Sequence, residues 1–168
     1  MLIVGLAPGM HGANRTGRPF TGDHAGILLF RTLHEQGFTD GPESVSADDG
    51  LQLRDCRITN AVRCLPPANK PTPAEVRECN PHLGWELEKL PEKAAVLALG
   101  AVAHGAVLRA YGLRAAAARF AHAATHALPG GRLLVDSYHC SRYNTQTRRL
   151  TPAMFADAMS LAREWAQR

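Results

Sequence analysis

The sequence predicts an α/β fold, a three-layer α/β/α sandwich around a mainly parallel four-stranded sheet. Short apolar runs that fit strands, such as Leu2–Leu6 and Ala94–Leu99, alternate with longer segments in which apolar residues recur every three or four positions. Strands that alternate with helices are typical of a parallel sheet covered on both faces. The chain has 168 residues, enough for one sizeable core, so we expect a single domain over residues 1–168.

The strands are expected at four apolar runs, with a fifth segment as a further candidate. The chain opens on Leu2–Leu6, and the other runs are Arg57–Val62, Ala94–Leu99 and Leu133–Ser137. Ala121–Ala127 is the further candidate.

Helix signals separate these strands. Thr72-Pro73-Ala74-Glu75 combines a threonine N-cap, a proline at the first helical position and a glutamate at the third, and the apolar face of the helix then continues to Leu90. Other helices are expected over Asp23–Gln36, over Val102–Tyr111 and after the Thr151-Pro152 cap.

Three polar loops follow strands: Ala7–Gly22, Arg63–Pro71 and Tyr138–Leu150. Binding sites of parallel sheets lie outside the carboxyl ends of the strands. We therefore expect the three loops to converge on one edge of the sheet and to form the site there.

The composition suits a polyanionic partner. The formal net charge is +4, the isoelectric point is about 9.1, and sixteen of the 19 basic residues are arginine, whose planar guanidinium pairs well with phosphate. A genome rich in G and C, which favours arginine and alanine codons, explains the same bias.

No apolar run approaches the length of a membrane helix, and the first residues lack the pattern of a signal peptide. We therefore expect no membrane association, a cytoplasmic location and a monomer. The four cysteines, Cys56, Cys64, Cys79 and Cys140, are then more consistent with free thiols, core residues or metal ligands than with disulfides.

The first loop is rich in glycine, with five glycines between Gly5 and Gly22 that allow backbone amides to approach a ligand closely. A nucleotide-phosphate loop is the generic alternative. The Walker pattern fails because no Gly-Lys-Ser/Thr follows, and Gly5 and Gly9 have the wrong spacing for a dinucleotide fingerprint.

The last loop, from Ser137 to Leu150, combines a histidine, two tyrosines and three arginines with hydroxyl and amide side chains. Such a set fits a nucleic-acid contact, in which arginines and hydroxyls meet phosphates and an aromatic side chain meets a base step. A solvated polar loop is the alternative for this segment taken alone.

Together these segments resemble the uracil-DNA glycosylase superfamily, specifically its family 5, or type b. The resemblance rests on three motifs: Gly-Leu-Ala-Pro-Gly-Met-His-Gly-Ala-Asn-Arg-Thr-Gly-Arg-Pro-Phe-Thr-Gly-Asp from Gly5 to Asp23, Ile-Thr-Asn-Ala-Val-Arg-Cys-Leu-Pro-Pro from Ile58 to Pro67, and Ser-Tyr-His-Cys-Ser-Arg-Tyr-Asn-Thr-Gln-Thr from Ser137 to Thr147. They stand in the family's order and span essentially the whole chain. The resemblance implies a DNA glycosylase that flips uracil, or another deaminated or damaged base, out of DNA and hydrolyses the N-glycosidic bond in base excision repair.

The resemblance also assigns roles. Asp23 would activate water or stabilise the sugar cation, and His139 would donate to the base oxygen on which charge builds. The substrate-binding positions would be Ala7, Gly9, His11, Asn14, Phe20 and Asn60, with Phe20 stacked on the base, Asn60 on the pyrimidine edge and no assigned role for His11. Ser141, Arg142, Tyr143 and Asn144 would contact DNA.

Each of these residues has a purely structural alternative. Phe20 could be a core residue, Asp23 a helix cap, and Asn60 a partner for backbone groups at the strand end. The remaining histidines, among them His104, His122 and His126, we interpret as structural or surface residues.

The family's [4Fe-4S] cluster, held by four cysteines, is the main departure. Cys64 and Cys79 match two of the ligands, but the chain begins at the first strand and lacks the N-terminal CxxC segment that supplies the others. Either the sequence is truncated and a full-length form holds the cluster, or the protein has lost it. We expect no cluster in this chain alone, because two thiolates do not hold a cubane. Cys79 also lies on the apolar face of its helix, where a buried thiol is the structural alternative.

Two other functions stay open at this point. A truncated or degenerate, catalytically inactive DNA-binding paralogue would keep the basic loops without the chemistry. A nucleotide-processing enzyme of another α/β type would use the glycine-rich loop for phosphate.

Overall fold

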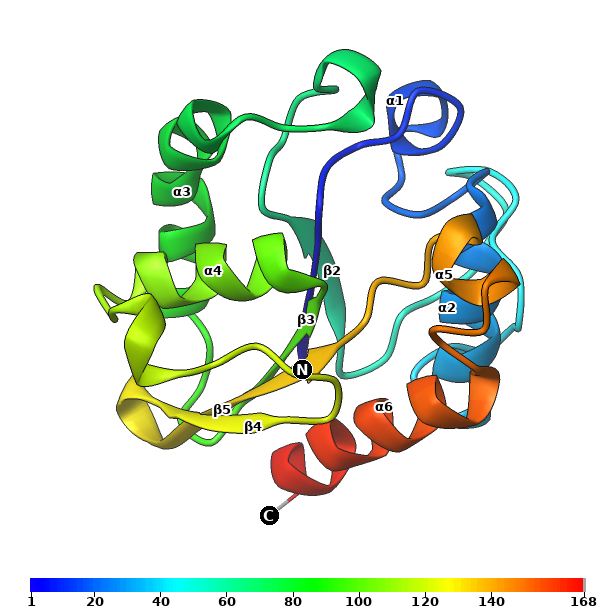
Figure 1. The fold of residues 1–168 in the computed structure, drawn as a ribbon. Helices are drawn as coiled ribbons and strands as arrows, with labels where there is room; N and C mark the ends of the chain where they lie inside the picture. The colour runs from blue at the N-terminus through cyan, green and yellow to red at the C-terminus, as the bar shows by residue number, and fades with distance from the viewer. Residues whose placement is uncertain (168) are drawn as a thin grey trace.

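The computed structural model describes residues 1–167, and its strands form one sheet between two layers of helices (Figure 1). The strands are β1 (Leu2–Gly5), β2 (Arg57–Asn60), β3 (Ala95–Leu99), β4 (Thr125–Leu128) and β5 (Arg132–Ser137). The helices are α1 (Ala13–Thr16), α2 (His24–Glu35), α3 (Pro73–Glu88), α4 (Ala101–Ala110), α5 (Arg142–Gln146) and α6 (Pro152–Ala166). Within the described residues, none of these helices is long and apolar enough to cross a membrane.

The strand order in the sheet is β2-β1-β3-β5-β4. The first four strands are parallel, and β4 pairs antiparallel with β5 at the edge. The mainly parallel sheet is confirmed, but it has five strands and not four. The fifth strand, β4, overlaps the segment expected as a further candidate, Ala121–Ala127, but its bounds are Thr125–Leu128. The shift arises because residues 123 and 124 bond to Asp136 in a turn before the regular ladder begins.

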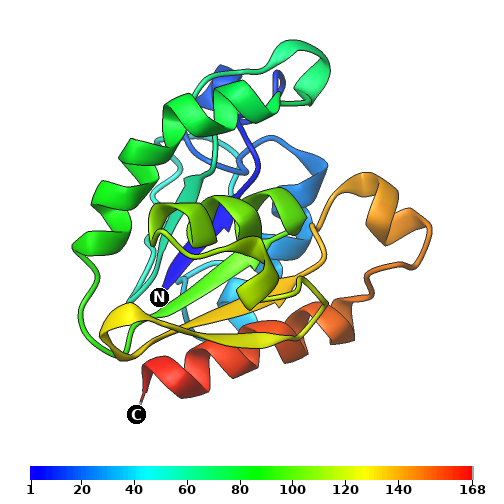
Figure 2. The same cartoon turned by 60° about the vertical axis from the view of Figure 1, so that its left-hand side comes forward.

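The two faces of the sheet are covered by different helices, which confirms the three-layer arrangement. Ile3, Leu97 and Val135 face a core formed with α2 and α6, and alternate positions such as Val4 and Val96 face a core formed with α3 and α4. This alternation is the two-residue period of a strand. Figure 2 shows the sheet between α4 on one side and α6 on the other.

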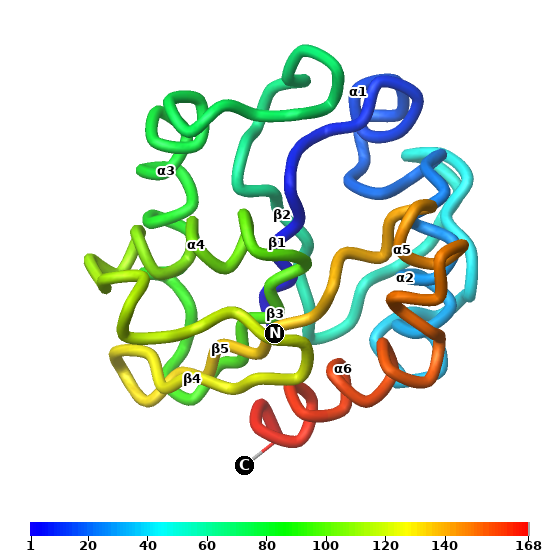
Figure 3. Tube along the Cα trace, viewed as in Figure 1, coloured from blue at the N-terminus to red at the C-terminus, as the bar shows by residue number. Residues whose placement is uncertain are grey.

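The parallel register places the carboxyl ends of the strands at one edge. Gly5 pairs with Asn60, and Leu99 pairs with Ser137. Figure 3 shows the chain continuing from β1 and β2 into loops at the same side of the molecule. The segments that follow β1 and β5 contain the short helices α1 and α5, which the sequence analysis missed because four or five residues are too few to show a helical period.

A buried carboxylate holds the end of β2 against α3. Glu86 of α3 accepts hydrogen bonds from Thr59 Oγ1 at 2.9 Å, from Arg57 Nη2 at 2.7 Å and from Arg63 Nη2. Its side chain is 3% exposed, whereas the side chains of Arg57 and Arg63 are 65% and 46% exposed. Charge-assisted hydrogen bonds of this kind are roughly twice as strong as neutral ones. The contact therefore fixes the strand that ends on Asn60 and the loop that follows it.

We predict that Glu86→Gln lowers the free energy of unfolding by about 1–3 kcal/mol, because a neutral amide weakens three hydrogen bonds to a buried group. Glu88→Gln is the matched control, an exposed glutamate two residues later in the same helix, and should change stability by less than about 0.5 kcal/mol. Urea denaturation measures both. Equal stability of the two variants would contradict the anchoring role.

Candidate active site

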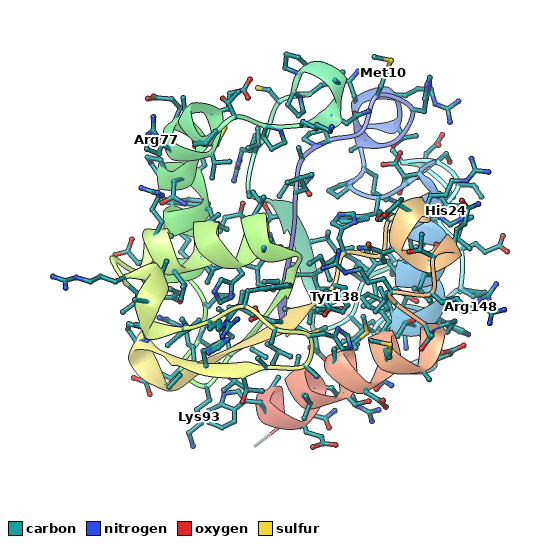
Figure 4. All side chains as sticks on the ribbon, viewed as in Figure 1. Met10, His24, Arg77, Lys93, Tyr138 and Arg148 are labelled. Atoms are coloured by element: carbon teal, nitrogen blue, oxygen red, sulfur yellow. The ribbon has the colours of Figure 1, made fainter. Side chains whose placement is uncertain are left out.

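A pocket of about 560 Å³ opens at the carboxyl edge of the sheet. Its walls come from the segments that follow β1, β2, β3 and β5. The predicted convergence of the three polar loops is therefore confirmed. The 63–71 loop contributes Asn69 to the wall. The predicted site residues in the wall are Ala7, Gly9, His11, Phe20, Asp23, Asn60, His139, Ser141 and Arg142. Met10 and His24, labelled in Figure 4, also line the pocket, and Met10 is 55% exposed at its rim.

Phe20 lies on one side of this pocket beside His139. Their ring centroids are 6.0 Å apart and their planes differ by 28°. The Phe20 backbone has a φ of 61°, in the left-handed region that aromatic residues rarely adopt. Phe20 also packs in the core under α2, so the same side chain is a core residue and part of the pocket wall. Strained backbone of this kind is concentrated at functional sites.

His139 is a half-buried imidazole in the wall of the pocket. Burial lowers the pKa of its imidazole from the usual 6.5 to about 4. A neutral imidazole keeps one N–H, which can donate to a ligand in the pocket without carrying a charge into it. Asn144, which does not line the pocket itself, donates from Nδ2 to the His139 carbonyl at 2.8 Å and so holds the backbone of this residue in place.

Asn60 presents an unsatisfied acceptor to the pocket. Its Oδ1 is buried, and no group within residues 1–167 donates to it. Buried polar atoms are hydrogen-bonded in the great majority of cases, and an unpaired one costs about 1–3 kcal/mol. The alternative of a bond from the strand-end backbone is therefore wrong for this oxygen, which is free to accept from a ligand N–H.

Asp23 occupies the N-cap position of α2, but its side chain makes no capping hydrogen bond. The carboxylate instead lies against the glycine-rich loop, so closely that a Cβ added at Gly12 would be 1.8 Å from its Oδ2. The capping alternative is therefore wrong for the carboxylate. Burial raises the pKa of Asp23, and His11 opposes this shift.

Three predicted site residues lie away from the pocket wall. Asn14 is exposed on α1, Tyr143 is 71% exposed on α5, and Asn144 acts behind His139. Ser141, which does line the pocket, accepts from Asn144 N at 3.4 Å as the N-cap of α5. The first turn of α5 thus carries Arg142 and Tyr143 beside the mouth of the pocket.

The sequence analysis missed the part of the wall that follows β3. Leu99, Gly100, Ala101 and Val102 line the pocket at the start of α4. This connection is a single glycine and has no polar side chain, so it did not stand out among the loops. The rule that the carboxyl ends of parallel strands share one edge would have included it.

The two cysteines matched to the iron–sulfur cluster do not form a complete site. Cys64 is exposed in the loop after β2, and Cys79 is half-buried on α3. In the part of the chain that the structure describes, neither belongs to a group of three or more histidine, cysteine or acidic ligands. A cubane cluster takes four ligands, so the residues present do not fit one.

We predict that His139 makes the protein less stable in acid. The unfolded chain protonates this imidazole below about pH 6.5 and the folded chain only near pH 4, so the unfolded state binds more protons in between. The free energy of unfolding should fall by up to about 3 kcal/mol across this range, at about 1.4 kcal/mol for each pKa unit. Urea denaturation of the wild type and of His139→Asn at several pH values measures the slope. An identical slope in the variant would contradict a buried, neutral imidazole.

Comparison with known proteins identifies the family. The model of the uracil DNA glycosylase superfamily matches residues 1–163. A type-5 uracil-DNA glycosylase of Thermus thermophilus is 52% identical over 166 residues, which cover 99% of this chain and 75% of that protein. Type-5 enzymes of Mycobacterium leprae and Pyrobaculum aerophilum are 48% and 44% identical, over 96% of this chain and 73% and 70% of theirs. The chain therefore belongs to the uracil DNA glycosylase superfamily, among its type-5 members.

Proposed function

We propose that this chain is a DNA glycosylase that removes uracil from DNA and so initiates base excision repair. The observation that carries the proposal is the content of one pocket: an unpaired amide oxygen on Asn60, a half-buried imidazole of lowered pKa on His139, the Phe20 ring and the Asp23 carboxylate. The names of the type-5 relatives give the substrate, uracil in DNA. They give no support to an inactive DNA-binding paralogue or to a nucleotide-processing enzyme.

The proposal requires the base to leave the duplex, because the glycosidic bond is out of reach within the base stack. The flipped uracil would stack on Phe20. Asn60 would read the edge of the ring, with its Oδ1 accepting the N3–H and its Nδ2 donating to a ring carbonyl. Ala7, Gly9 and His11 would close the pocket around base and sugar.

Cleavage of the N-glycosidic bond leaves positive charge on the deoxyribose and negative charge on the departing base. His139 would donate a hydrogen bond to the base oxygen on which the charge builds, and Asp23 would stabilise the sugar cation and orient the attacking water. The water oxygen bonds to C1′, its proton is released, and the base takes up a proton as it leaves. One preorganised donor in such a site is worth about 3 kcal/mol.

The mouth of the pocket would meet the DNA strand. Ser141 and Asn144 would bond phosphates, and the exposed Tyr143 or its neighbour Arg142 would fill the space that the flipped nucleotide leaves. Asn14, exposed on α1, would contact the sugar-phosphate side of the flipped nucleotide. The net charge of +4 favours all of these contacts.

The range of lesions is proposed to include other deaminated or damaged bases. Ala7 contributes only a methyl group to the pocket wall. A polar side chain at this position would select among bases by hydrogen bonding. Cys64 and Cys79 stay predicted cluster ligands for a form that gains two further thiolates from outside these 168 residues. A monomer in a reducing compartment such as the cytoplasm fits the four free cysteines of the described residues.

The direct test incubates the chain with a labelled oligonucleotide that contains one deoxyuridine and then cleaves abasic sites with hot alkali. We expect strand scission at the uracil and none at thymine. His139→Ala should lower the rate of excision by about 100- to 1000-fold, the effect of losing one such donor. His82→Ala, an exposed histidine on α3, is the control and should keep full activity. No scission by a folded chain that binds the DNA would overturn the proposal.

A second test moves the Asp23 carboxylate without removing it. In Gly12→Ala the new Cβ would stand 1.8 Å from Asp23 Oδ2, so the carboxylate must shift. We expect the excision rate to fall at least about 100-fold, the cost of a misplacement of about 1 Å. Gly105→Ala on α4 meets no atom within 4 Å and serves as the matched control. If both variants excise uracil equally fast, the position of Asp23 does not matter for the reaction.

A further inference from the structure

Three side chains with metal-ligand chemistry meet on the α4 face of the sheet, apart from the pocket. Asp136 of β5 is fully buried, and its two carboxylate oxygens face different histidines. Oδ1 lies 2.8 Å from His104 Nδ1 on α4, and Oδ2 lies 3.1 Å from His126 Nε2 on β4. The side chains of the two histidines are 6% and 16% exposed. The proposed reaction uses none of the three.

The hydrogen-bond pattern of His104 indicates that a proton or a metal ion lies between its Nδ1 and Asp136. His104 Nε2 lies 3.0 Å from the carbonyl oxygen of Ala118, which can only accept, so Nε2 carries a hydrogen. A neutral imidazole then has a lone pair at Nδ1, facing the carboxylate at 2.8 Å. Two acceptors in contact inside a protein repel each other. Either a second proton or a metal ion must lie between them.

We propose that His104, His126 and Asp136 bind a divalent transition-metal ion of the zinc class. Two imidazoles and one carboxylate are a ligand set that zinc takes, with bonds of about 2.0–2.2 Å. Ligands around a tetrahedral ion are then roughly 3.4 Å apart. The three ligand atoms here lie within 4.8 Å of one another. To reach the tetrahedral spacing, the contacts of Asp136 with His104 and His126, now 2.8 and 3.1 Å, would lengthen by about 0.6 and 0.3 Å, and the widest pair of ligand atoms would close by up to about 1.4 Å.

The surroundings of the three residues support a metal in preference to a proton. A metal-bound histidine generally donates its other ring N–H to a carbonyl or carboxylate, which is what His104 does to Ala118. The orientation of His126 places a second imidazole at the same carboxylate. A single proton shared by His104 and Asp136 would not require this second imidazole. Imidazole ligands favour zinc, cobalt or nickel over magnesium or calcium.

The bound ion would have a structural consequence near the pocket. It would connect α4, the edge strand β4 and β5 at one point. Ala101 and Val102, in the first turn of α4, line the pocket, and β5 leads directly to His139. The partly exposed His126 lies on the outermost strand and gives the ion a route from solvent.

Titration of the untagged, chelator-treated chain with Co²⁺ and then Zn²⁺ tests the site. We expect one Co²⁺ per chain with a tetrahedral spectrum free of thiolate charge transfer, displacement by Zn²⁺, and a thermal unfolding midpoint that rises with Zn²⁺ concentration. His126→Ala should weaken binding by more than the roughly 10- to 100-fold that follows loss of an outer partner of a metal site. His82→Ala, an exposed histidine outside the cluster, should bind as the wild type does. If His126→Ala unfolds, His126→Gln replaces it.

Three results would overturn the proposal. These are no saturable binding, equal affinity in the His126 and His82 variants, and a cobalt spectrum dominated by thiolate, which would put the ion on cysteines. In the first case, nitrogen NMR should find His104 protonated at both ring atoms, and the cluster would be a buried ion pair.

Discussion

The parallel pairing of β1 with β2 and β3, and of β3 with β5, determines where every group of the pocket lies. The ladders bring Gly5 level with Asn60, and Leu99 level with Ser137. The polar segments that follow β1, β2 and β5 then begin at the same edge, although they are far apart in the sequence. The buried contact of Glu86 with Thr59 and two arginines extends this control to the end of β2. Rigid elements, and not mobile loops, thus hold the side chain of Asn60 and the start of the segment that carries His139.

The second constraint is desolvation. Asn60 keeps a buried oxygen without a partner, His139 is held neutral, and the pKa of the Asp23 carboxyl is raised by burial. The unpaired oxygen and the raised pKa of Asp23 lower the stability of the folded protein at neutral pH, and the lowered pKa of His139 lowers it in acid. Each state prepares a group for charge or hydrogen bonds that a substrate would bring. The site lowers the stability of the fold, and its groups are fitted to a pyrimidine edge, a base anion and a sugar cation. This combination is consistent with selection for catalysis.

Much of this could be predicted from the sequence, because the relevant signals are local. The bounds of four of the five strands to within two residues, the Thr72 capping box and the convergence of polar loops follow from short-range patterns, and the three motifs identify the family. The sequence could not predict that Asp23 turns from its helix to the backbone of Gly12, since that depends on how the loop folds back. It also could not group His104, His126 and Asp136, which lie on three elements and join only when β4 pairs with β5. Each histidine by itself indicates only a structural or surface residue, and their shared carboxylate is visible only in three dimensions.

The most direct test of the account compares excision of uracil and of N3-methyluracil from the same DNA, because methylation removes the N–H that Asn60 Oδ1 is proposed to accept. Single-turnover rates with the wild type and with Asn60→Ala measure the effect, and the smaller alanine leaves room for the methyl group. The account predicts that the wild type strongly prefers uracil and that the variant removes both bases slowly and at similar rates. Equal rates for the two bases with the wild type would contradict it, because the buried oxygen would then have no part in recognising the base.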